Sequence, residues 1–498
     1  MKRAAVVPRP AIGLDRRLSV PLHRQLYERL RVAILRGQLA AGARLPSTRS
    51  LAHELGISRT TVLVAYEQLR AEGYLEGRVG AGTTVALLPP ESLLRAPGPS
   101  TGTTSRVRTG TRRSPSRRGA LMAQAPNVPS TPPRSGAQAA FRVGVPALDA
   151  FPHELWNRLI VRRARRSPRD LVDYQEVGGY LPLRRAIAAH LGVSRGVRCD
   201  ADQVVVVSGG QSAVDLVARV LLDPGDAAWL EDPGYLGARG ALLGAGAEVV
   251  GVPVDDQGLD VSAGVELCPT ARLAFVTPSH QHPLAVTMSL ARRLELLAWA
   301  GRANAWIVED DYDSEYRHAG RPLASLQSLD DDGRVIYVGT FTKVLFPALR
   351  IGYVVVPEDL VDAFLAARRF SDACPGALQQ ATLADFIGEG HFERHLRRMR
   401  TLYAGRAAVL SREATRHLDG ILELQPPTAG IHVVGWLPSG VDDHMASRSA
   451  AAAGVVTRPL SMYRSGRSGR PGLVLGYGYI DEDGITRGVR RLAEALRR

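Results

Sequence analysis

Short runs of β-branched residues alternate with helix-length segments from about residue 141 to the end of the chain. The predicted strands are all rich in apolar residues and lie at Val204–Val207, Ala228–Leu230, Val249–Val252, Leu273–Thr277, Trp306–Val308, Val335–Val338 and Ile351–Val355. Strands that alternate with helices form mostly parallel sheets, with helices covering both faces. The pattern therefore predicts an α/β domain over residues 141–498, with ligands bound beyond the carboxyl ends of its strands.

Positive charge is concentrated before this domain. Residues 1–87 hold 14 lysines and arginines against 6 acidic residues, and residues 88–140 hold 8 against 1. The whole chain of 498 residues has a net charge of +14, so the remainder is nearly neutral. This asymmetry predicts a polyanion-binding part at the N-terminal end of a chain with two or three domains.

Residues 88–140 are predicted to be a flexible linker. Proline, glycine, serine, threonine, alanine and arginine dominate this segment, and such a composition buries too little apolar surface to offset its ordering entropy. The run Arg106–Gly119 either contacts DNA phosphates or forms a solvated tether that is extended by self-repulsion.

Residues 20–87 show the pattern of three short helices followed by a hairpin. Apolar residues recur at helical spacing in three groups, namely Leu22, Leu26, Leu30 and Ala33; Leu51, Ala52 and Leu55; and Val62, Ala65, Tyr66 and Leu69. Gly56 permits a tight turn between the second and third helices, and Ser58 can cap the third. This spacing predicts a helix-turn-helix, with a protein-interaction module as the alternative interpretation.

A DNA-reading role would use the start of the third helix and the hairpin. Arg59, Thr60 and Thr61 fall in the first turn of that helix, where side chains meet the major groove. Leu75–Val85 can form a two-stranded wing, with Arg78 and Gly80–Gly82 at its tip.

Pro21–Val85 resembles the winged helix-turn-helix of GntR-type transcription regulators, including the runs LPSTRSLA, GISRTTV and GRVGAGT. The resemblance implies a DNA-binding domain over residues 1–87 that binds double-stranded DNA. The implied DNA-contacting residues are Arg44, Ser47, Arg49, Ser58, Arg59, Thr60, Thr61, Arg78 and Gly80.

Lys343 is one of two lysines in the chain, the other being Lys2, against 61 arginines. A primary amine can form a Schiff base with a carbonyl group, which a guanidinium cannot do. Lys343 follows the predicted strand Val335–Val338, and Arg350 follows seven residues later. Chance survival of one lysine is the simpler explanation, so the neighbouring strand ends must decide.

Two other strand ends complete a set of groups. Ser208–Gln211 joins a strand to a helix, where amides and the helix dipole suit a phosphate. Glu309–Asp313 follows another strand and supplies a carboxylate for a ring nitrogen and a phenol for a ring oxygen. With the amine of Lys343, these are the groups that pyridoxal 5′-phosphate (PLP) requires.

Residues 141–498 resemble fold-type I PLP-dependent aminotransferases. The resemblance implies that Lys343 is the Schiff-base lysine, that Asp310 pairs with the pyridine nitrogen, and that Tyr174 reaches the phosphate in the other subunit of a head-to-tail homodimer. The remaining implied cofactor-binding residues are Gly210, Gln211, Tyr235, Tyr312, Thr340, Thr342 and Arg350. A GntR-type domain joined to such a body resembles the MocR-type regulators, the group that includes GabR and PdxR.

The chain departs from the aminotransferase pattern in two places. The usual Asn-Pro-x-Gly turn is His282-Pro283-Leu284-Ala285, where His282 either bonds the cofactor or packs. The strand Gly472–Tyr477 lacks the arginine that clamps a substrate carboxylate, and without such a clamp an amino acid is poorly oriented. The candidates for a replacement are Arg458, Arg464 and Arg470.

These observations favour a PLP-dependent transcription regulator that senses an amine or the cofactor itself. An active aminotransferase with an accessory DNA-binding domain and a DNA-binding scaffold that no longer binds PLP are the alternatives. Three widely spaced cysteines (Cys199, Cys268 and Cys374) show no metal-ligand spacing and predict a reducing cytoplasm. We find no signal peptide and no apolar run long enough to span a membrane.

Overall fold

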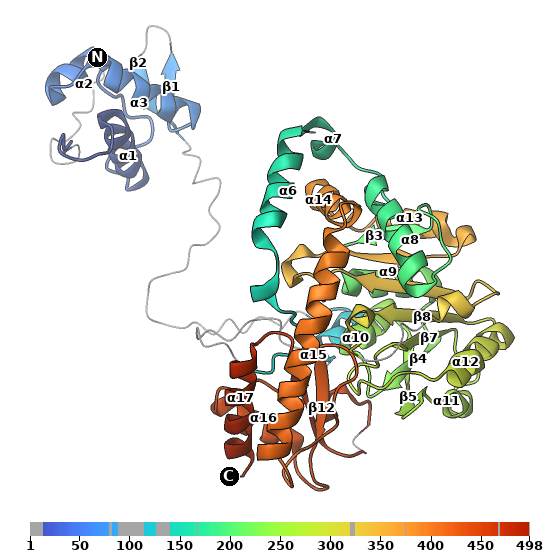
Figure 1. The fold of residues 1–498 in the computed structure, drawn as a ribbon. Coiled ribbons are helices and arrows are strands. Elements are labelled where there is room, and N and C mark those ends of the chain that lie inside the picture. The colour runs from blue at the N-terminus through green and yellow to red at the C-terminus, as the bar shows by residue number, and fades with distance from the viewer. Residues whose placement is uncertain are drawn as a thin grey trace. The chain divides into compact units, whose positions relative to one another are not determined.

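The computed structural model describes residues 13–78, 82–87, 114–125, 140–166, 168–318, 324–373, 375–466 and 469–497 (Figure 1). The chain divides into two compact units, residues 1–111 and 112–498. The division falls within the predicted linker, and the two units are described separately below.

The first unit contains three helices packed around one apolar core, as the sequence predicts. They are α1 (Leu22–Leu35), α2 (Thr48–Leu55) and α3 (Arg59–Ala71). Gly56 ends α2 in the left-handed region at φ 63°, and Ser58 caps α3 by accepting a 3.1 Å hydrogen bond from the amide of Thr61. Leu26, Leu51 and Val62 are all buried in the shared core.

A wing follows the helices. Strands β1 (Leu75–Arg78) and β2 (Gly82–Val85) pair antiparallel, and Arg44 forms an isolated bridge with Thr84. The guanidinium of Arg44 lies against Gly82, where an added Cβ would come within 2.8 Å of its Nε. Gly82 has a φ of 88°, so glycine is favoured here by both backbone and space. Gly80 lies outside the described residues.

The predicted linker contains a helix that the sequence analysis did not anticipate. Helix α5 (Arg117–Gln124) begins at Ser116, whose side chain accepts a hydrogen bond from the amide of Gly119. It contacts α10 (Leu236–Ala245) in the second unit, where Met122 lies beside Gly244.

A mixed eight-stranded sheet forms the centre of the second unit. Its strand order is β3, β10, β9, β8, β7, β4, β5, β6. The bounds are β3 Val204–Val207, β10 Gly352–Val355, β9 Val335–Thr340, β8 Trp306–Asp311, β7 Leu273–Val276, β4 Ala227–Asp232, β5 Glu248–Asp255 and β6 Gly258–Leu259. The sheet is mostly parallel, as predicted, but β10 pairs antiparallel with both β3 and β9, which the local pattern did not reveal.

Helices cover both faces of this sheet. In β3, Val204 and Val206 belong to one apolar core, whereas Val205 and Val207 belong to another, because successive side chains point to opposite faces. The covering helices include α8 (Leu181–Arg195), α9 (Gly210–Leu221), α10, α11 (Val261–Leu267), α12 (Leu290–Ala303), α13 (Val361–Arg369) and α14 (Ala377–Gly388). The predicted fold class, an α/β body with helices on both faces, is confirmed.

The C-terminal part adds a second, antiparallel sheet. It has the order β11 (Glu423–Leu424), β12 (His432–Trp436), β14 (Gly472–Gly476), β13 (Arg458–Pro459). The remaining helices are α6 (His153–Arg166), α7 (Pro168–Val172), α15 (His391–His417), α16 (Asp443–Ala452) and α17 (Glu482–Leu496). Figure 1 shows the long helix α15 extending from the large-sheet region to this smaller subdomain. Within the described ranges, no helix has the length and apolarity needed to span a membrane.

Candidate cofactor site and DNA-binding surface

Lys343 lies just beyond the end of β9, which extends to Thr340. Its Nζ donates a 2.9 Å hydrogen bond to the carbonyl oxygen of Gly144. Burial lowers the pKa of the amine, while the carboxylates of Asp313 and Asp310 raise it in part. A lowered pKa increases the fraction of neutral, nucleophilic amine that can form a Schiff base.

Asp310 lies within β8, because that strand continues to Asp311 rather than ending at Val308. Its side chain is 8% exposed and has no hydrogen-bond or ion-pair partner among the described residues. Burial raises the pKa of Asp310 to about 8, and the nearby acids Asp311 and Glu231 raise it further. A cationic group placed beside this carboxylate would therefore be stabilised.

Tyr312 follows Asp310 on the same strand end. Its phenol donates a 2.8 Å hydrogen bond to the carbonyl oxygen of His280. Burial raises the pKa of this phenol well above its usual value, so Tyr312 stays protonated and can donate at neutral pH.

The strand-helix turn after β3 forms the predicted anion site. Gly209 has a φ of 97° and precedes α9, which begins at Gly210. Arg350 donates a 2.7 Å hydrogen bond to the carbonyl oxygen of Ser208, and its guanidinium carbon would lie 3.2 Å from a Cβ added to Gly209. The helix N-terminus and this guanidinium together suit a phosphate.

Two threonines lie at the end of β9 beside Lys343. The Oγ1 of Thr340 accepts a 3.2 Å hydrogen bond from the amide of Thr342. The Oγ1 of Thr342 is buried and has no hydrogen-bond partner among the described residues. Such an orphaned hydroxyl fits a site completed by a polar ligand.

Tyr235 connects this turn with α10, which begins directly after it. Its phenol donates a 3.1 Å hydrogen bond to the side-chain oxygen of Gln211, and Gln211 donates to the carbonyl oxygen of Gly237. Tyr174, in contrast, is fully exposed and contacts none of these groups within its own chain.

The residues of this chain fit PLP. The unpartnered Asp310 carboxylate suits the ring nitrogen, the Arg350 side of α9 suits the phosphate, and Lys343 suits the aldehyde. The absence of side chains at Gly144 and Gly209 leaves room beside Lys343 and Arg350.

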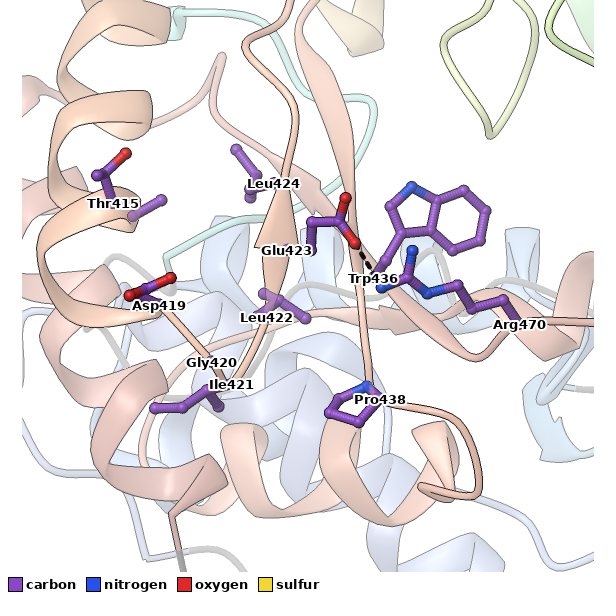
Figure 2. Close-up of a pocket in the computed structure, with 11 residues that line it drawn as sticks. Thr415, Asp419, Gly420, Ile421, Leu422, Glu423, Leu424, Trp436, Pro438 and Arg470 are labelled. Atoms are coloured by element: carbon purple, nitrogen blue, oxygen red, sulfur yellow. Dashed lines mark hydrogen bonds and ion pairs between the residues drawn. The ribbon is translucent and has the colours of Figure 1, made fainter.

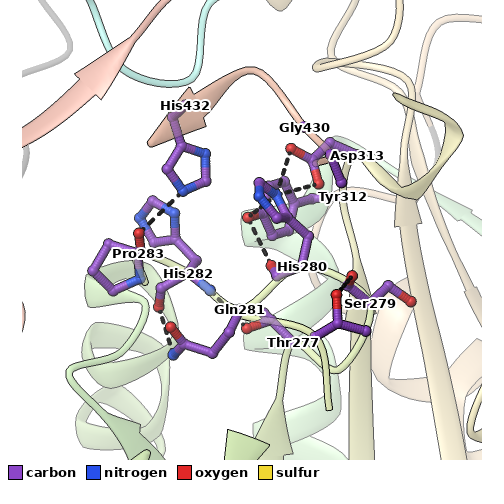
Figure 3. Close-up of polar contacts among 12 residues, drawn as sticks. Thr277, Ser279, His280, Gln281, His282, Pro283, Tyr312, Asp313, Gly430 and His432 are labelled. Carbon is purple, nitrogen blue, oxygen red and sulfur yellow. Dashed lines mark hydrogen bonds and ion pairs between the residues drawn. The ribbon is translucent and has the colours of Figure 1, made fainter. Parts of the chain in front are cut away.

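Three histidines gather next to this site (Figure 3). His280 and His282 follow β7, whereas His432 begins β12 in the smaller sheet. The ring centroids lie 4.8 Å apart for His280 and His432 and 5.2 Å apart for His282 and His432. We call these three side chains the histidine cluster; the analysis of local motifs did not detect it, since its members are far apart in sequence.

His280 is oriented by a buried carboxylate. Its Nδ1 lies 3.0 Å from Asp313 Oδ1, and Asp313 is 1% exposed. Ligand atoms of His280, Asp313 and His432 lie within 4.8 Å of one another, a spacing that a metal ion could share. The existing bond between His280 and Asp313 would have to be replaced for that purpose.

The three arginines near the C-terminus do not occupy equivalent positions. Arg470 forms a 2.5 Å ion pair with Glu423 and stacks over Trp436, in a separate pocket that includes Leu422 and Pro438 (Figure 2). Arg464 donates a 2.7 Å hydrogen bond to the carbonyl oxygen of Arg470.

Arg458 lies on β13, where it pairs with Val474 of β14. Residues paired in this way point to the same face of a sheet. Arg458 therefore lies closer than Arg464 or Arg470 to the strand that lacks the expected arginine.

In the first unit, the structure gathers most predicted DNA-binding residues around α2, α3 and the wing. Arg59 and Thr60 are exposed in the first turn of α3, and Ser47 caps α2 by accepting a 3.1 Å hydrogen bond from the amide of Ser50. Arg49 is also exposed, whereas the hydroxyl of Thr61 is bonded to Ser58 at 2.8 Å. Ser47 and Ser58 thus have structural roles that do not depend on DNA.

Sequence models of two families match the chain. The family "Bacterial regulatory proteins, gntR family" matches residues 22–85, and "Aminotransferase class I and II" matches residues 148–473. These matches and the fold define a class of transcription regulator in which a GntR-type DNA-binding domain precedes an aminotransferase-like domain.

Full-length relatives narrow the class. The chain is 46% identical to the "Probable rhizopine catabolism regulatory protein MocR" of Rhizobium meliloti, over 97% of this chain and 95% of the relative. It is 32% identical to the "HTH-type pyridoxine biosynthesis transcriptional regulator PdxR" of Corynebacterium glutamicum, over 96% of both chains. The chain belongs to the MocR/PdxR-type family of GntR transcription regulators.

Solved structures support the same conclusion for the second unit. The α-aminoadipate aminotransferase LysN of Thermus thermophilus, complexed with N-(5′-phosphopyridoxyl)-L-leucine, matches with a TM-score of 0.67 and 30% identity. The match covers 72% of this chain and 92% of LysN. The predicted fold-type I aminotransferase domain is confirmed.

Proposed function

We propose that this chain is a PLP-dependent regulator that binds DNA through residues 1–87 and senses a small molecule through residues 141–498, with residues 88–140 as the connection. The observation that carries the proposal is the buried amine of Lys343, set beside Asp310 and the Arg350 anion site. PLP bound as a Schiff base with Lys343 would supply an electrophilic carbon that reacts with primary amines.

Each site residue has a proposed task toward PLP. Asp310 would hold the ring nitrogen in its protonated form, Tyr312 would donate to the ring hydroxyl, and Tyr235 would stack on the ring. The phosphate would be bound by Gly210, Gln211, Thr340, Thr342 and Arg350. Tyr174 would reach the phosphate of a second copy, which requires a head-to-tail homodimer with shared sites; its full exposure agrees with that role.

The signal would be an amine or PLP itself. A bound ligand shifts a protein between arrangements only if it binds one of them better. The body would thus alter the spacing of the paired DNA-binding domains through the connecting segment.

The direct test has two parts. Borohydride reduction followed by peptide mapping should place one pyridoxyl group on Lys343 and none on Lys2, the only other lysine. The Lys343→Arg variant keeps the charge and should lose the adduct. Gel shifts on the upstream DNA of the protein's own gene should show specific, salt-sensitive binding that responds to PLP. Absence of the adduct, or of specific DNA binding with and without PLP, would contradict the proposal.

An active aminotransferase is the second candidate, favoured by the structural match to LysN. Incubation with amino donors and 2-oxo acids separates the two functions. Sustained turnover at ordinary enzyme rates, above about 1 per second, would favour the enzyme. A regulator would give at most a single half-reaction for each site.

A further inference from the structure

The histidine cluster is bordered by the same groups that border Lys343. The positive charge of Lys343 contributes to lowering the pKa of both His282 and His432. The carboxylate of Asp313 acts on Lys343 and also bonds His280. The cluster therefore belongs to the wall of the Lys343 site.

The rings of His282 and His432 are uncharged at neutral pH. Burial lowers the pKa of His282 to about 3, with Lys343 and His280 lowering it further. Burial also lowers the pKa of His432 well below its usual value. A neutral imidazole offers one hydrogen-bond donor and one acceptor and cannot neutralise an anion.

Existing contacts determine which nitrogen accepts. His432 Nε2 lies 3.3 Å from the carbonyl oxygen of Pro283, which can only accept, so Nε2 carries the hydrogen and Nδ1 is the acceptor. His280 Nδ1 faces Asp313, so Nε2 is the acceptor, and it is buried without a partner among the described residues. Two acceptor nitrogens are thus directed to the same cluster.

Hydroxyl groups and carboxylates differ at such a wall. A hydroxyl can donate its hydrogen to either nitrogen, whereas a carboxylate only accepts and would face nitrogen lone pairs and the buried carboxylate of Asp313. The guanidinium groups of Arg464 and Arg470 bond elsewhere, and Arg350 lies at the turn before α9. Arg350 is the one arginine in the described part of the chain whose charge measurably shifts the pKa of Lys343.

We propose that the histidine cluster makes this site select a primary amine that bears hydroxyl groups and no carboxylate. The inference rests on the proposed function, since the amine would be presented to PLP at Lys343. It names the chemical class of effector that the missing strand arginine left open.

Three small amines with one carbon skeleton test the selection. Serinol has two hydroxymethyl groups beside its amine, serine replaces one with a carboxylate, and isopropylamine replaces both with methyl groups. Calorimetric titration of the PLP-loaded, full-length protein in an amine-free buffer would give the three affinities. We expect serinol to bind at least about tenfold more tightly than either analogue, the value of one net hydrogen bond.

Variants assign the selection to particular residues. In His432→Phe, the ring remains but the acceptor is lost, so serinol should bind within about threefold of isopropylamine. In Arg458→Gln, which removes the arginine nearest the incomplete strand, the order of the three probes should not change. If serine binds more tightly than serinol, or if Arg458→Gln selectively weakens serine, the inference is wrong.

Two controls separate this inference from its alternatives. Every sample is first reduced and mapped, so that failure of PLP to attach to Lys343 counts against the proposed function and not against the effector class. Titration in EDTA should leave the serinol affinity unchanged. Loss of serinol binding in EDTA would instead assign the cluster of His280, Asp313 and His432 to a metal ion and overturn the inference.

Discussion

The amine of Lys343 donates a hydrogen bond of 2.9 Å to the carbonyl oxygen of Gly144, a residue near the start of the aminotransferase-like domain. Gly144 has a φ of 75°, and a Cβ added there would lie 2.7 Å from Lys343 Nζ. The backbone conformation and the nearness of the amine both favour glycine at this position.

Gly144→Ala should therefore displace the Lys343 amine as well as strain the backbone. We expect the pyridoxyl adduct on Lys343 to fall severalfold and the free energy of unfolding to fall by about 1 kcal/mol. Gly333→Ala is a matched control, since Gly333 has a φ of 65° and open space around it. The control should lose similar stability and keep the adduct; equal adduct yields in the two variants would contradict the prediction.

The pKa of Asp310 predicts how stability depends on pH when PLP is removed. With its pKa raised to about 8, against about 4 in the unfolded chain, Asp310 binds more protons in the folded state between these values. Its contribution to the free energy of unfolding is present at low pH and is lost as the pH rises toward and through 8.

Thermal unfolding of PLP-free protein between pH 6 and pH 8.5 tests this sign. Asp310→Asn should reduce the decline in Tm with rising pH, whereas Asp331→Asn, at an exposed carboxylate, should not. PLP should raise the Tm of the parent protein more than that of Asp310→Asn, because a ring cation stabilises the Asp310 carboxylate. An identical pH slope in parent and Asp310→Asn would show that the carboxyl does not titrate as described.

The sequence predicts those parts of the site that follow local rules. Lys343, Asp310 and Gly210 each lie at or beside the carboxyl end of a parallel strand, which is recognisable from an apolar run and the residues after it. Gly144 and His432 escape such reasoning because they approach Lys343 from segments that are distant in sequence and are positioned only by tertiary packing.

Two features of the fold escape it for different reasons. The antiparallel direction of β10 depends on its pairing with β3 and β9, and the run of apolar residues carries no sign of direction. Helix α5 lies in a segment whose composition predicts disorder, and its contact with α10 supplies stabilisation that composition cannot show.

The turn after His282 contains a strained residue. Ala285 adopts a φ of 63°, in the left-handed region, where related aminotransferase turns carry the usual glycine. Ala285→Gly should remove this strain and raise the free energy of unfolding by about 1 kcal/mol, as measured in urea. Ala189→Gly, on the exposed side of α8, should lower it by a similar amount, because glycine weakens helix interiors. A loss of stability in Ala285→Gly would contradict the assignment of strain.

Arg59 is the most direct test of the DNA-binding surface. It is exposed at the first position of α3, where a reading helix meets the major groove. Arg59→Ala should weaken operator binding by about tenfold or more, since a base or phosphate contact contributes roughly 1–3 kcal/mol. Arg29→Ala removes the same charge from an exposed position of α1 and should change affinity much less. Equal losses in both variants, measured by fluorescence anisotropy at one salt concentration, would indicate a general charge effect and not a contact made by Arg59.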